Sequence, residues 1–107
     1  MSFLRALVAA GFVFALVHAF GQTTADQSLT ESSVYRKSCA KCHGRTAEGR
    51  HFGGPSLISE KTTSKSEEDL RNIITEGKGR MPKFGAKLGS TEIDTLIKQI
   101  RASGPHN

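Results

Sequence analysis

The sequence is poor in the residues that usually stabilise a small domain. Its 107 residues include no tryptophan, one tyrosine and two cysteines. A chain this short buries little apolar surface against its conformational entropy, so it commonly depends on disulfides, a structural metal or a large cofactor. A disulfide between Cys39 and Cys42 would close a loop too small to help much. These shortages argue against a disulfide framework and favour a bound cofactor.

A concentrated basic stripe, an internal repeat and a low-complexity segment are also missing. The chain carries 15 Lys and Arg against 10 Asp and Glu, a formal net charge of +5. Nucleic-acid-binding surfaces usually combine a basic stripe with interleaved aromatic side chains. The single tight basic cluster in the sequence consists of Lys78, Arg80, Lys83 and Lys87. We therefore expect no nucleic-acid partner.

The N-terminal fifth of the chain has the pattern of a secretory signal peptide. A short positive start ends at Arg5, and the following stretch Ala6–Val17 is apolar or small and carries no charge. Cleavage is predicted after Ala19, with Gly21 and Ala25 as alternative sites. An uncleaved membrane anchor fits less well, because a spanning helix needs about 20 apolar residues. The pattern predicts an exported, periplasmic protein whose mature chain has no membrane span.

The remaining length suits a single domain. The predicted organisation is a signal peptide over 1–19, a flexible N-terminal segment over 20–30, a folded domain over 31–104 and a tail over 105–107.

The predicted secondary structure is helical, because no segment has a convincing strand pattern. The first helix runs from Thr30 to about Cys39, with Ser28 or Thr30 as its cap. A glycine-rich stretch over 44–63 has little periodicity and is predicted to be a loop. Such a long loop is unusual inside a compact domain unless it surrounds something.

Two further helices are predicted after this loop. Ser64 or Ser66 caps the first of them, acidic residues occupy its first turn, and Gly77 ends it. The other runs from about Ser90 to Ala102, and its apolar residues recur with the spacing of one helical face. Those residues are Ile93, Leu96, Ile97 and Ile100. The expected fold class is all-α.

The most informative motif is Cys39-Ala40-Lys41-Cys42-His43. Two thiols three positions apart on a helical turn can each add across one vinyl group of the same haem. The adjacent histidine is then held where its imidazole faces the iron. The motif predicts one covalently bound haem c.

Three other interpretations of the two cysteines are open. A thioredoxin-like redox pair needs a strand before the motif and a long helix after it, and the sequence predicts neither. A zinc site could use Cys39, Cys42 and one of His43, His51 or His106, although the chain has no second closely spaced pair. A structural disulfide is possible in an oxidising compartment. His51 and His106 are otherwise expected to be solvated surface residues.

Met81 is the predicted ligand on the opposite face of the iron. It is the one methionine after the signal peptide. Pro82 follows it directly, and a residue before proline rarely lies on a regular helix or strand of the core. A thioether is a soft, neutral ligand that stabilises ferrous iron and raises the reduction potential relative to a second histidine. Filling of the core is the alternative role for an isolated methionine.

Four segments, taken in order, resemble the signatures of class I bacterial cytochromes c. They are Val34–Gly44, Gly54–Leu57, Gly77–Gly85, and Glu92-Ile93 with Leu96 and Ile100. The match covers essentially all of the chain after the signal peptide. The resemblance implies an all-α cytochrome c fold, with about three to four helices wrapped around one covalently bound haem.

The resemblance also implies roles for individual residues. His43 would be the proximal ligand of the iron and Met81 the distal ligand. The Pro55 carbonyl would accept a hydrogen bond from the His43 ring, which would orient the imidazole and make it a better donor. The further haem-pocket residues would be Tyr35, Leu57, Leu70, Ile74, Phe84 and Leu96.

Two positions depart from the family pattern. Family members often place a glycine four residues before the Tyr35 position and an aromatic residue three after the Leu96 position, where this chain has Glu31 and Gln99. We expect the first and last helices to cross at a wider distance, or to be joined by a polar contact between those two side chains.

The predicted function is outer-sphere electron transfer between redox proteins by a monomer. With His43 and Met81 both bound, the iron would have no open position, so the predicted protein is an electron carrier and not an enzyme. The basic cluster near Met81 would steer an acidic docking surface or, alternatively, belong to a solvated loop. Two other functions are open: an electron-accepting subunit of a periplasmic dehydrogenase complex, and a five-coordinate peroxidase or gas sensor.

Overall fold

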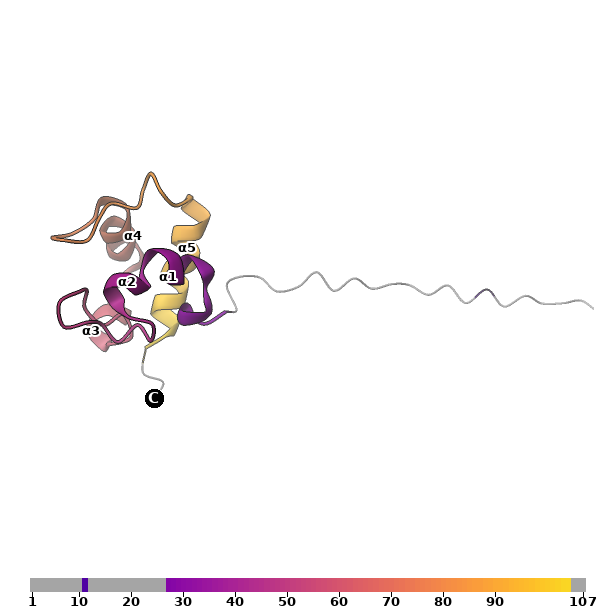
Figure 1. Ribbon diagram of the computed structural model, residues 1–107. Coiled ribbons are helices and arrows are strands. Elements are labelled where there is room, and N and C mark those ends of the chain that lie inside the picture. The colour runs from indigo at the N-terminus through magenta and orange to yellow at the C-terminus, as the bar shows by residue number, and fades with distance from the viewer. Residues whose placement is uncertain (1–10, 12–26, 105–107) are drawn as a thin grey trace, which may run out of the picture.

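Short helices and two irregular segments make up the part of the chain that the computed structural model describes, Gly11 and residues 27–104 (Figure 1). The elements are the 3-10 turn η2 (Leu29–Glu31) and the helices α1 (Ser33–Ser38), α2 (Ala40–His43), α3 (Glu60–Thr63), α4 (Glu67–Glu76) and α5 (Ser90–Ala102). These residues form no strand, and an isolated bridge joins Lys78 to Met81. The all-α prediction is confirmed. The predicted signal peptide, Gly11 apart, and the predicted tail lie outside the described residues.

The start of the domain differs from the single helix predicted from Thr30 to about Cys39. Turn η2 comes first, and Ser32 then takes an extended backbone with φ −60° and ψ 127°. The Ser32 hydroxyl accepts the amide of Tyr35 at 3.4 Å and so caps α1. Because a capping residue cannot continue the preceding helix, two short elements replace one long one. Leu29 is buried, so the fold begins before residue 31.

Helix α4 begins and ends at the predicted capping residues. The Ser66 hydroxyl accepts the amide of Asp69 at 3.1 Å, and three acidic side chains in the first turn favour the positive end of the helix dipole. Gly77 ends the helix with φ +75°, a conformation that favours glycine, and its amide bonds to the Ile73 carbonyl at 2.9 Å. Local capping chemistry therefore fixes the length of α4.

Helix α5 spans the predicted residues and lies at the centre of the packing, in contact with η2, α1, α3 and α4. The Glu92 carboxylate accepts the Gly89 amide at 3.0 Å, which secures the first turn of α5. The core consists of Leu29, Tyr35, Ala47, Leu70, Ile74, Ile93, Leu96, Ile97 and Ile100. All four apolar residues predicted to share one face of α5 are therefore buried.

Two surface ion pairs also join α4 to α5. Arg71 pairs with Asp94, and the Arg101 guanidinium lies 3.2 Å from the Glu67 carboxylate. All four side chains are roughly half exposed, so each pair contributes at most about 1 kcal/mol. Burial of apolar side chains, rather than these pairs, holds the two helices together.

The two polar residues near the crossing of the first and last helices bond to main-chain groups. Gln99 is buried, and its side-chain amide donates to the Gln27 carbonyl at 3.2 Å. The exposed Glu31 carboxylate accepts the Ser28 amide at 3.3 Å. Gln99 thus links α5 to the segment that precedes η2.

The loop predicted over 44–63 was expected to contain no helix, and this is wrong for its last residues, which form α3. The Thr62 side chain is buried, and its hydroxyl donates to the Ser56 carbonyl at 2.7 Å. A single helical turn is too short to show a periodic apolar pattern, which is why the sequence does not reveal it. Among residues 27–104, no helix is long and apolar enough to cross a membrane.

Candidate functional site

The two cysteines lie where α1 passes into α2. Cys39 is half-buried and separates the two helices, whereas Cys42 lies within α2 and is exposed. Both are free thiols. Burial, and to a smaller extent the charge of Cys42, raises the pKa of the Cys39 thiol to about 11. At neutral pH Cys39 is therefore a protonated thiol beside a more accessible one.

The structure bears on two of the three other interpretations of these cysteines, the thioredoxin-like redox pair and the zinc site. No strand precedes the motif within the described residues, so a thioredoxin-like arrangement is missing there. Residues 27–104 also contain no group of three or more His, Cys, Asp or Glu side chains that could hold a metal ion. His51 is exposed, and His106 lies outside the described residues. The residues that the structure describes therefore support neither a redox pair of that kind nor a zinc site.

His43 is buried, and its ring is held by a hydrogen bond. Its Nδ1 lies 2.8 Å from the Pro55 carbonyl oxygen. A carbonyl only accepts, so Nδ1 donates its hydrogen in this bond, and in the neutral ring the lone pair then lies on Nε2. This is the tautomer that a metal-ligating imidazole needs, with its far nitrogen bonded to a carbonyl. The hydrogen bond implied by the resemblance is present.

Gly54 lies directly against the His43 ring. A Cβ atom at residue 54 would be 2.5 Å from the ring Cε1 and 2.6 Å from Nδ1, closer than carbon and nitrogen atoms normally approach. Gly53 has a similar role beside α2, because a Cβ atom there would lie 2.4 Å from the Cys42 carbonyl oxygen. Two adjacent glycines therefore let the loop approach the histidine closely enough for Pro55 to bond to it.

The loop over 44–56 is held to the motif by main-chain hydrogen bonds. Gly54 donates to the Cys42 carbonyl at 2.7 Å, and Gly49 donates to the His43 carbonyl at 2.8 Å. The loop is further fixed to its own end by a 2.8 Å bond from the Leu57 amide to the Ala47 carbonyl. The loop therefore needs no secondary structure of its own to keep its shape.

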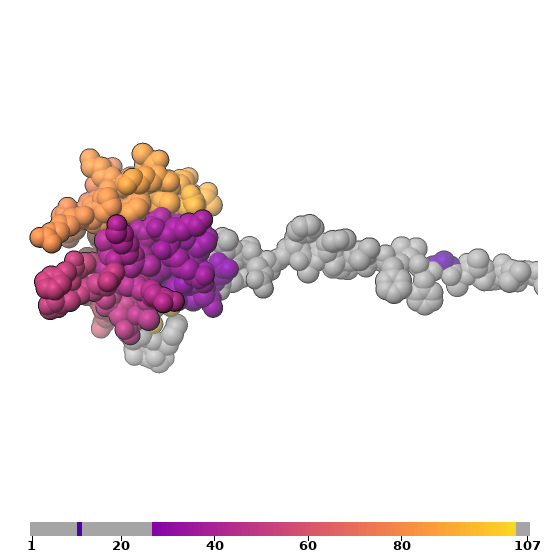
Figure 2. Space-filling view, in the orientation of Figure 1, coloured from indigo at the N-terminus to yellow at the C-terminus, as the bar shows by residue number. Residues whose placement is uncertain are grey.

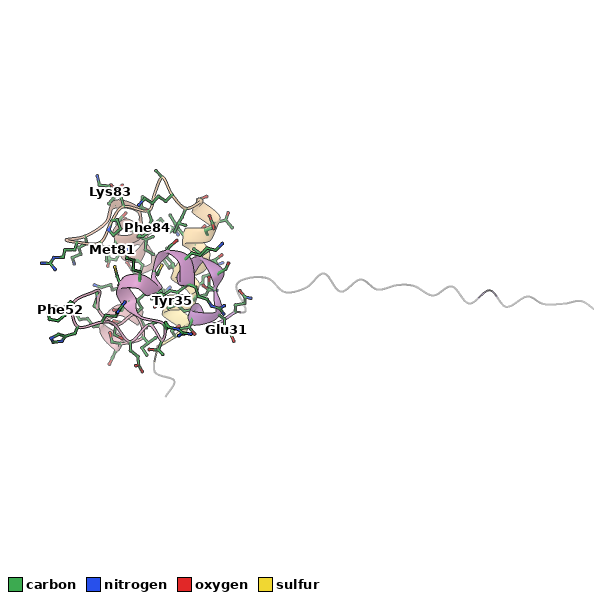
Figure 3. All side chains as sticks on the ribbon, in the orientation of Figure 1. Glu31, Tyr35, Phe52, Met81, Lys83 and Phe84 are labelled. Atoms are coloured by element: carbon green, nitrogen blue, oxygen red, sulfur yellow. The ribbon has the colours of Figure 1, made fainter. Side chains whose placement is uncertain are left out.

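Met81 lies on a tight turn that follows α4. The Met81 amide donates to the Lys78 carbonyl at 2.9 Å, and Gly79 takes a positive φ of +58° in the turn between them. Gly77 must also be small, since a Cβ atom there would lie 2.5 Å from the Met81 carbonyl oxygen. The Met81 side chain is half-buried and packs against the core. Figure 3 shows it between the loop that carries Phe52 and the segment that carries Lys83.

The predicted pocket residues divide into two groups. Tyr35, Leu70, Ile74 and Leu96 are buried in the core, whereas Leu57 and Phe84 are half-buried and pack against it, as Cys39 and Met81 do. Figure 2 shows the loop over 44–56 and the segment around Met81 projecting from the same edge of the molecule, whose outline is notched between them. Apolar side chains that the fold covers only in part are those that a large apolar group would bury.

Tyr35 supports the same segment from inside the core. Its ring is fully buried, and its hydroxyl donates to the Gly44 carbonyl at 2.6 Å, directly after the motif histidine. Burial, and to a smaller extent the charge of Cys39, raises the pKa of Tyr35 to about 12. The sequence indicated a pocket role for Tyr35, but its bond to Gly44 could not be read from residue spacing.

The raised pKa of Tyr35 predicts a loss of stability in alkaline solution. An unfolded tyrosine titrates near pH 10, so between pH 10 and about 12 the folded chain retains a proton that the unfolded chain has lost. The free energy of unfolding therefore falls as pH rises, by at most about 1.4 kcal/mol per pH unit for one proton.

Urea unfolding is measured at several pH values for the wild type and for Tyr35→Phe. The difference between their free energies of unfolding removes the contribution of the other titrating groups. The variant should lack this alkaline slope. Because the chain has one tyrosine, its ring carbon resonance reports the ionisation directly. Equal slopes for the two proteins would contradict the expectation.

The basic cluster around Met81 is fully on the surface. Lys78, Arg80, Lys83 and Lys87 are exposed, and the Lys87 ammonium lies 5.5 Å from the centre of the Phe84 ring. A cation at this distance is attracted to the ring face, so Lys87 helps to hold Phe84 in place. From the sequence, Gly44 and Gly54 were named only as part of the glycine-rich loop and the family signatures, and Phe52 was not singled out. Phe52 could have been noticed as a lone large apolar residue in a glycine-rich loop.

Comparisons with known proteins find one matching family model and several related sequences. The family model described as cytochrome c oxidase, cbb3-type, subunit III matches residues 26–99. The cbb3-type cytochrome c oxidase subunit FixP of Rhizobium etli is 32% identical over 97 residues, which cover 86% of this chain and 34% of that protein. This chain thus spans about a third of the length of FixP.

Two relatives are shorter proteins. Cytochrome c6 of Picosynechococcus sp. is 31% identical over 108 residues, covering 89% of this chain and 90% of the relative. Cytochrome c-551 of Bacillus subtilis is 35% identical over 63 residues, covering 59% of this chain and 54% of the relative. The similarity thus includes both an oxidase subunit and small proteins with cytochrome names.

Proposed function

The chain belongs to the family of cytochrome c oxidase, cbb3-type, subunit III, and from that membership we propose that it is a periplasmic carrier of single electrons. It is a class I cytochrome c that binds haem c covalently, and an electron carrier rather than an enzyme. The proposal concerns the ligands of the haem iron, the compartment and the partners. The hydrogen bond between His43 Nδ1 and the Pro55 carbonyl is the observation that carries the proposed ligation of the iron.

The residues of the site fit a covalent haem. Cys39 and Cys42 are free thiols on one helical segment. Each thiol would add across one vinyl group of the haem. Its sulfur would bond to one vinyl carbon and its hydrogen would pass to the other, so that the double bond becomes a single bond. His43 would ligate the iron through Nε2, and Met81 would supply the second ligand from the opposite loop. The half-buried side chains of Leu57 and Phe84 would contact the macrocycle.

Haem supplies an iron that stores one electron without bond making or breaking in a substrate. The protein groups keep the donor atoms fixed while the charge changes. Pro55 holds the proton on Nδ1 of His43, which orients the ring and strengthens its other nitrogen as a ligand. The tight turn at Gly79 positions the soft sulfur of Met81, which favours the reduced state. Ligation by both residues would leave no site for a substrate.

The proposed compartment and assembly follow from the sequence. A signal peptide over 1–19 would direct export to the periplasm, where haem attachment and electron exchange with other redox proteins would take place. The mature chain would act as a monomer. We propose no nucleic-acid partner and no membrane span in the mature chain.

The mass of the mature protein tests the proposal. Full-length chain is produced in cells with a working haem-attachment system, and the purified product is weighed intact. We expect a coloured protein, processed after Ala19 and heavier by one haem, that does not lose its colour under denaturing conditions. The control is the double variant Cys39→Ser/Cys42→Ser, which should be colourless. Wild-type protein without added mass would overturn the proposal.

A second candidate is a subunit of a larger oxidase or dehydrogenase complex. The similarity to FixP, which is an oxidase subunit, favours it. A whole-cell extract prepared in mild detergent and run on a sizing column would distinguish the two functions. A free carrier elutes alone at its monomer size, whereas a subunit elutes with other chains at fixed ratio.

A further inference from the structure

Phe52 is a large apolar side chain that the fold leaves in solvent. It is 93% exposed, and the described residues contain no other exposed large apolar side chain. Figure 3 shows it at the tip of its loop, pointing away from the helices. Scattered surface residues of this kind need no explanation by themselves. The surroundings of Phe52, however, are specific.

The Phe52 ring stands on a tightly bonded turn. Gly53 donates to the Arg50 carbonyl at 3.0 Å, and Arg50 donates to the Gly54 carbonyl at 3.1 Å. The His51 ring packs edge-on against Phe52, with centroids 4.6 Å apart at 82°. The exposure is therefore a property of an ordered turn. Burial of such a ring by a partner costs little conformational entropy, which favours a role in binding.

The same turn is bonded to the segment that carries the haem cysteines. The Arg50 guanidinium donates to the Lys41 carbonyl at 2.9 Å, and the Gly54 amide donates to the Cys42 carbonyl at 2.7 Å. Cys42 is itself exposed. A protein that covers Phe52 would consequently also approach the place where the haem is attached.

The charges on this stretch are predominantly positive. Between residues 41 and 52, the exposed cations Lys41, Arg45 and Arg50 face a single acidic residue, Glu48. An apolar centre with a charged rim is the usual composition of a protein docking surface. Positive rim charges select a partner with carboxylates at matching positions.

We propose that Phe52 is the aromatic anchor of a docking surface, formed with Lys41, Arg45 and Arg50, for a redox protein that offers an apolar recess bordered by carboxylates. This inference rests on the proposed function and identifies where the electron leaves or enters. A second copy of the chain fits poorly, because the chain is net positive, formally +5 over the full sequence, and two positive copies repel each other. A lipid surface fits poorly too, because it would cover the cofactor side with a material that accepts no electrons.

Binding and electron transfer to native acceptors test the inference. Washed membranes and periplasmic extract of the source organism serve as acceptors for the reduced, haem-loaded protein, which loses one electron as the acceptor gains one. We expect Phe52→Ser to raise the KM for oxidation by about tenfold or more, because the burial of one phenylalanine is lost. If the acceptor is in the membranes, the Kd measured by cosedimentation with them should rise by the same factor. The kcat should be unchanged. Phe52→Trp is the matched control and should retain both constants.

The test separates this inference from the proposed function. Mass, absorption spectrum and the rate of oxidation by ferricyanide, a small acceptor that needs no protein docking surface, should be equal in wild type and Phe52→Ser. Wild-type protein without haem would end the proposed function and the inference together. Haem-loaded wild type that neither fraction oxidises, or equal KM values for the two proteins, would overturn the inference alone.

Three further results show what binds to the surface around Phe52: an acidic protein, a lipid surface or a second copy of the chain. Equal binding to vesicles made only of the extracted membrane lipids would replace the protein partner with a lipid surface. A dimer that Phe52→Ser dissociates would replace it with a second copy. Binding or oxidation that is lost after protease treatment of the acceptor fraction, and that weakens with salt, supports an acidic protein.

Discussion

Replacement of Met81 by histidine is expected to lower the reduction potential of the haem-loaded protein. The imidazole is a harder and more strongly donating ligand than the thioether, so it stabilises the ferric state. Axial ligands set haem potentials over a range of about 0.8 V, and we expect a shift on the order of 0.1–0.3 V within it. A potentiometric titration followed by the absorption spectrum measures the shift.

The matched control for this substitution is Arg80→His. Arg80 is exposed on the same turn, one position before Met81, so the control adds the same imidazole without touching the proposed ligand. Its potential should stay close to that of the wild type. A Met81→His protein with an unchanged potential and spectrum would show that Met81 does not bind the iron.

Replacement of Gly54 by alanine is expected to disrupt the His43 side of the site. The new methyl group would lie 2.5 Å from the ring Cε1 and 3.0 Å from Nε2, so either the ring or the loop must move. Overpacking of this kind costs about 1–3 kcal/mol or more. We expect a lower midpoint in urea, together with loss of bound haem or a changed ligation spectrum.

Gly89→Ala is a suitable control for the change at Gly54. Gly89 has φ −68°, and the nearest atom to a new methyl group is the Glu92 carboxylate at 3.6 Å, an ordinary contact. Because Gly89 is the N-cap of α5, where glycine is preferred to alanine, stability should fall by about 0.5–1 kcal/mol, while the bound haem and its spectrum should stay those of the wild type. If Gly54→Ala folds with wild-type stability and spectrum, the close contact between residue 54 and the histidine is not needed.

The helical frame of the fold was accessible from the sequence because its signals are local. Helix α5 has the predicted bounds, since four apolar residues repeat at helical spacing and Glu92 caps the first turn. Helix α4 was expected to start at Ser64 or Ser66 and to end at Gly77, and the structure has Ser66 as its cap. In both cases, residues within one or two turns of each other determine where the helix starts and stops.

The irregular segments were harder to predict because distant atoms determine them. Ala47 is fully buried with a φ of +62°, and α3 is one turn long; neither leaves a pattern in the sequence. The hydrogen bond between His43 and Pro55 was expected from the family resemblance, but the contact of Gly54 with the ring depends on how the loop folds back. Likewise, nothing in the spacing of Tyr35 and Gly44 indicates that they bond.

The loop over 44–56 also determines how this protein can diverge in evolution. Its shape rests on main-chain atoms and on small residues at Gly53 and Gly54, whereas Arg45, His51 and Phe52 point their side chains into solvent. Mutation can therefore change those three side chains while the histidine keeps its orientation. Lineages could acquire new partners one surface residue at a time, without passing through a form that has lost its cofactor.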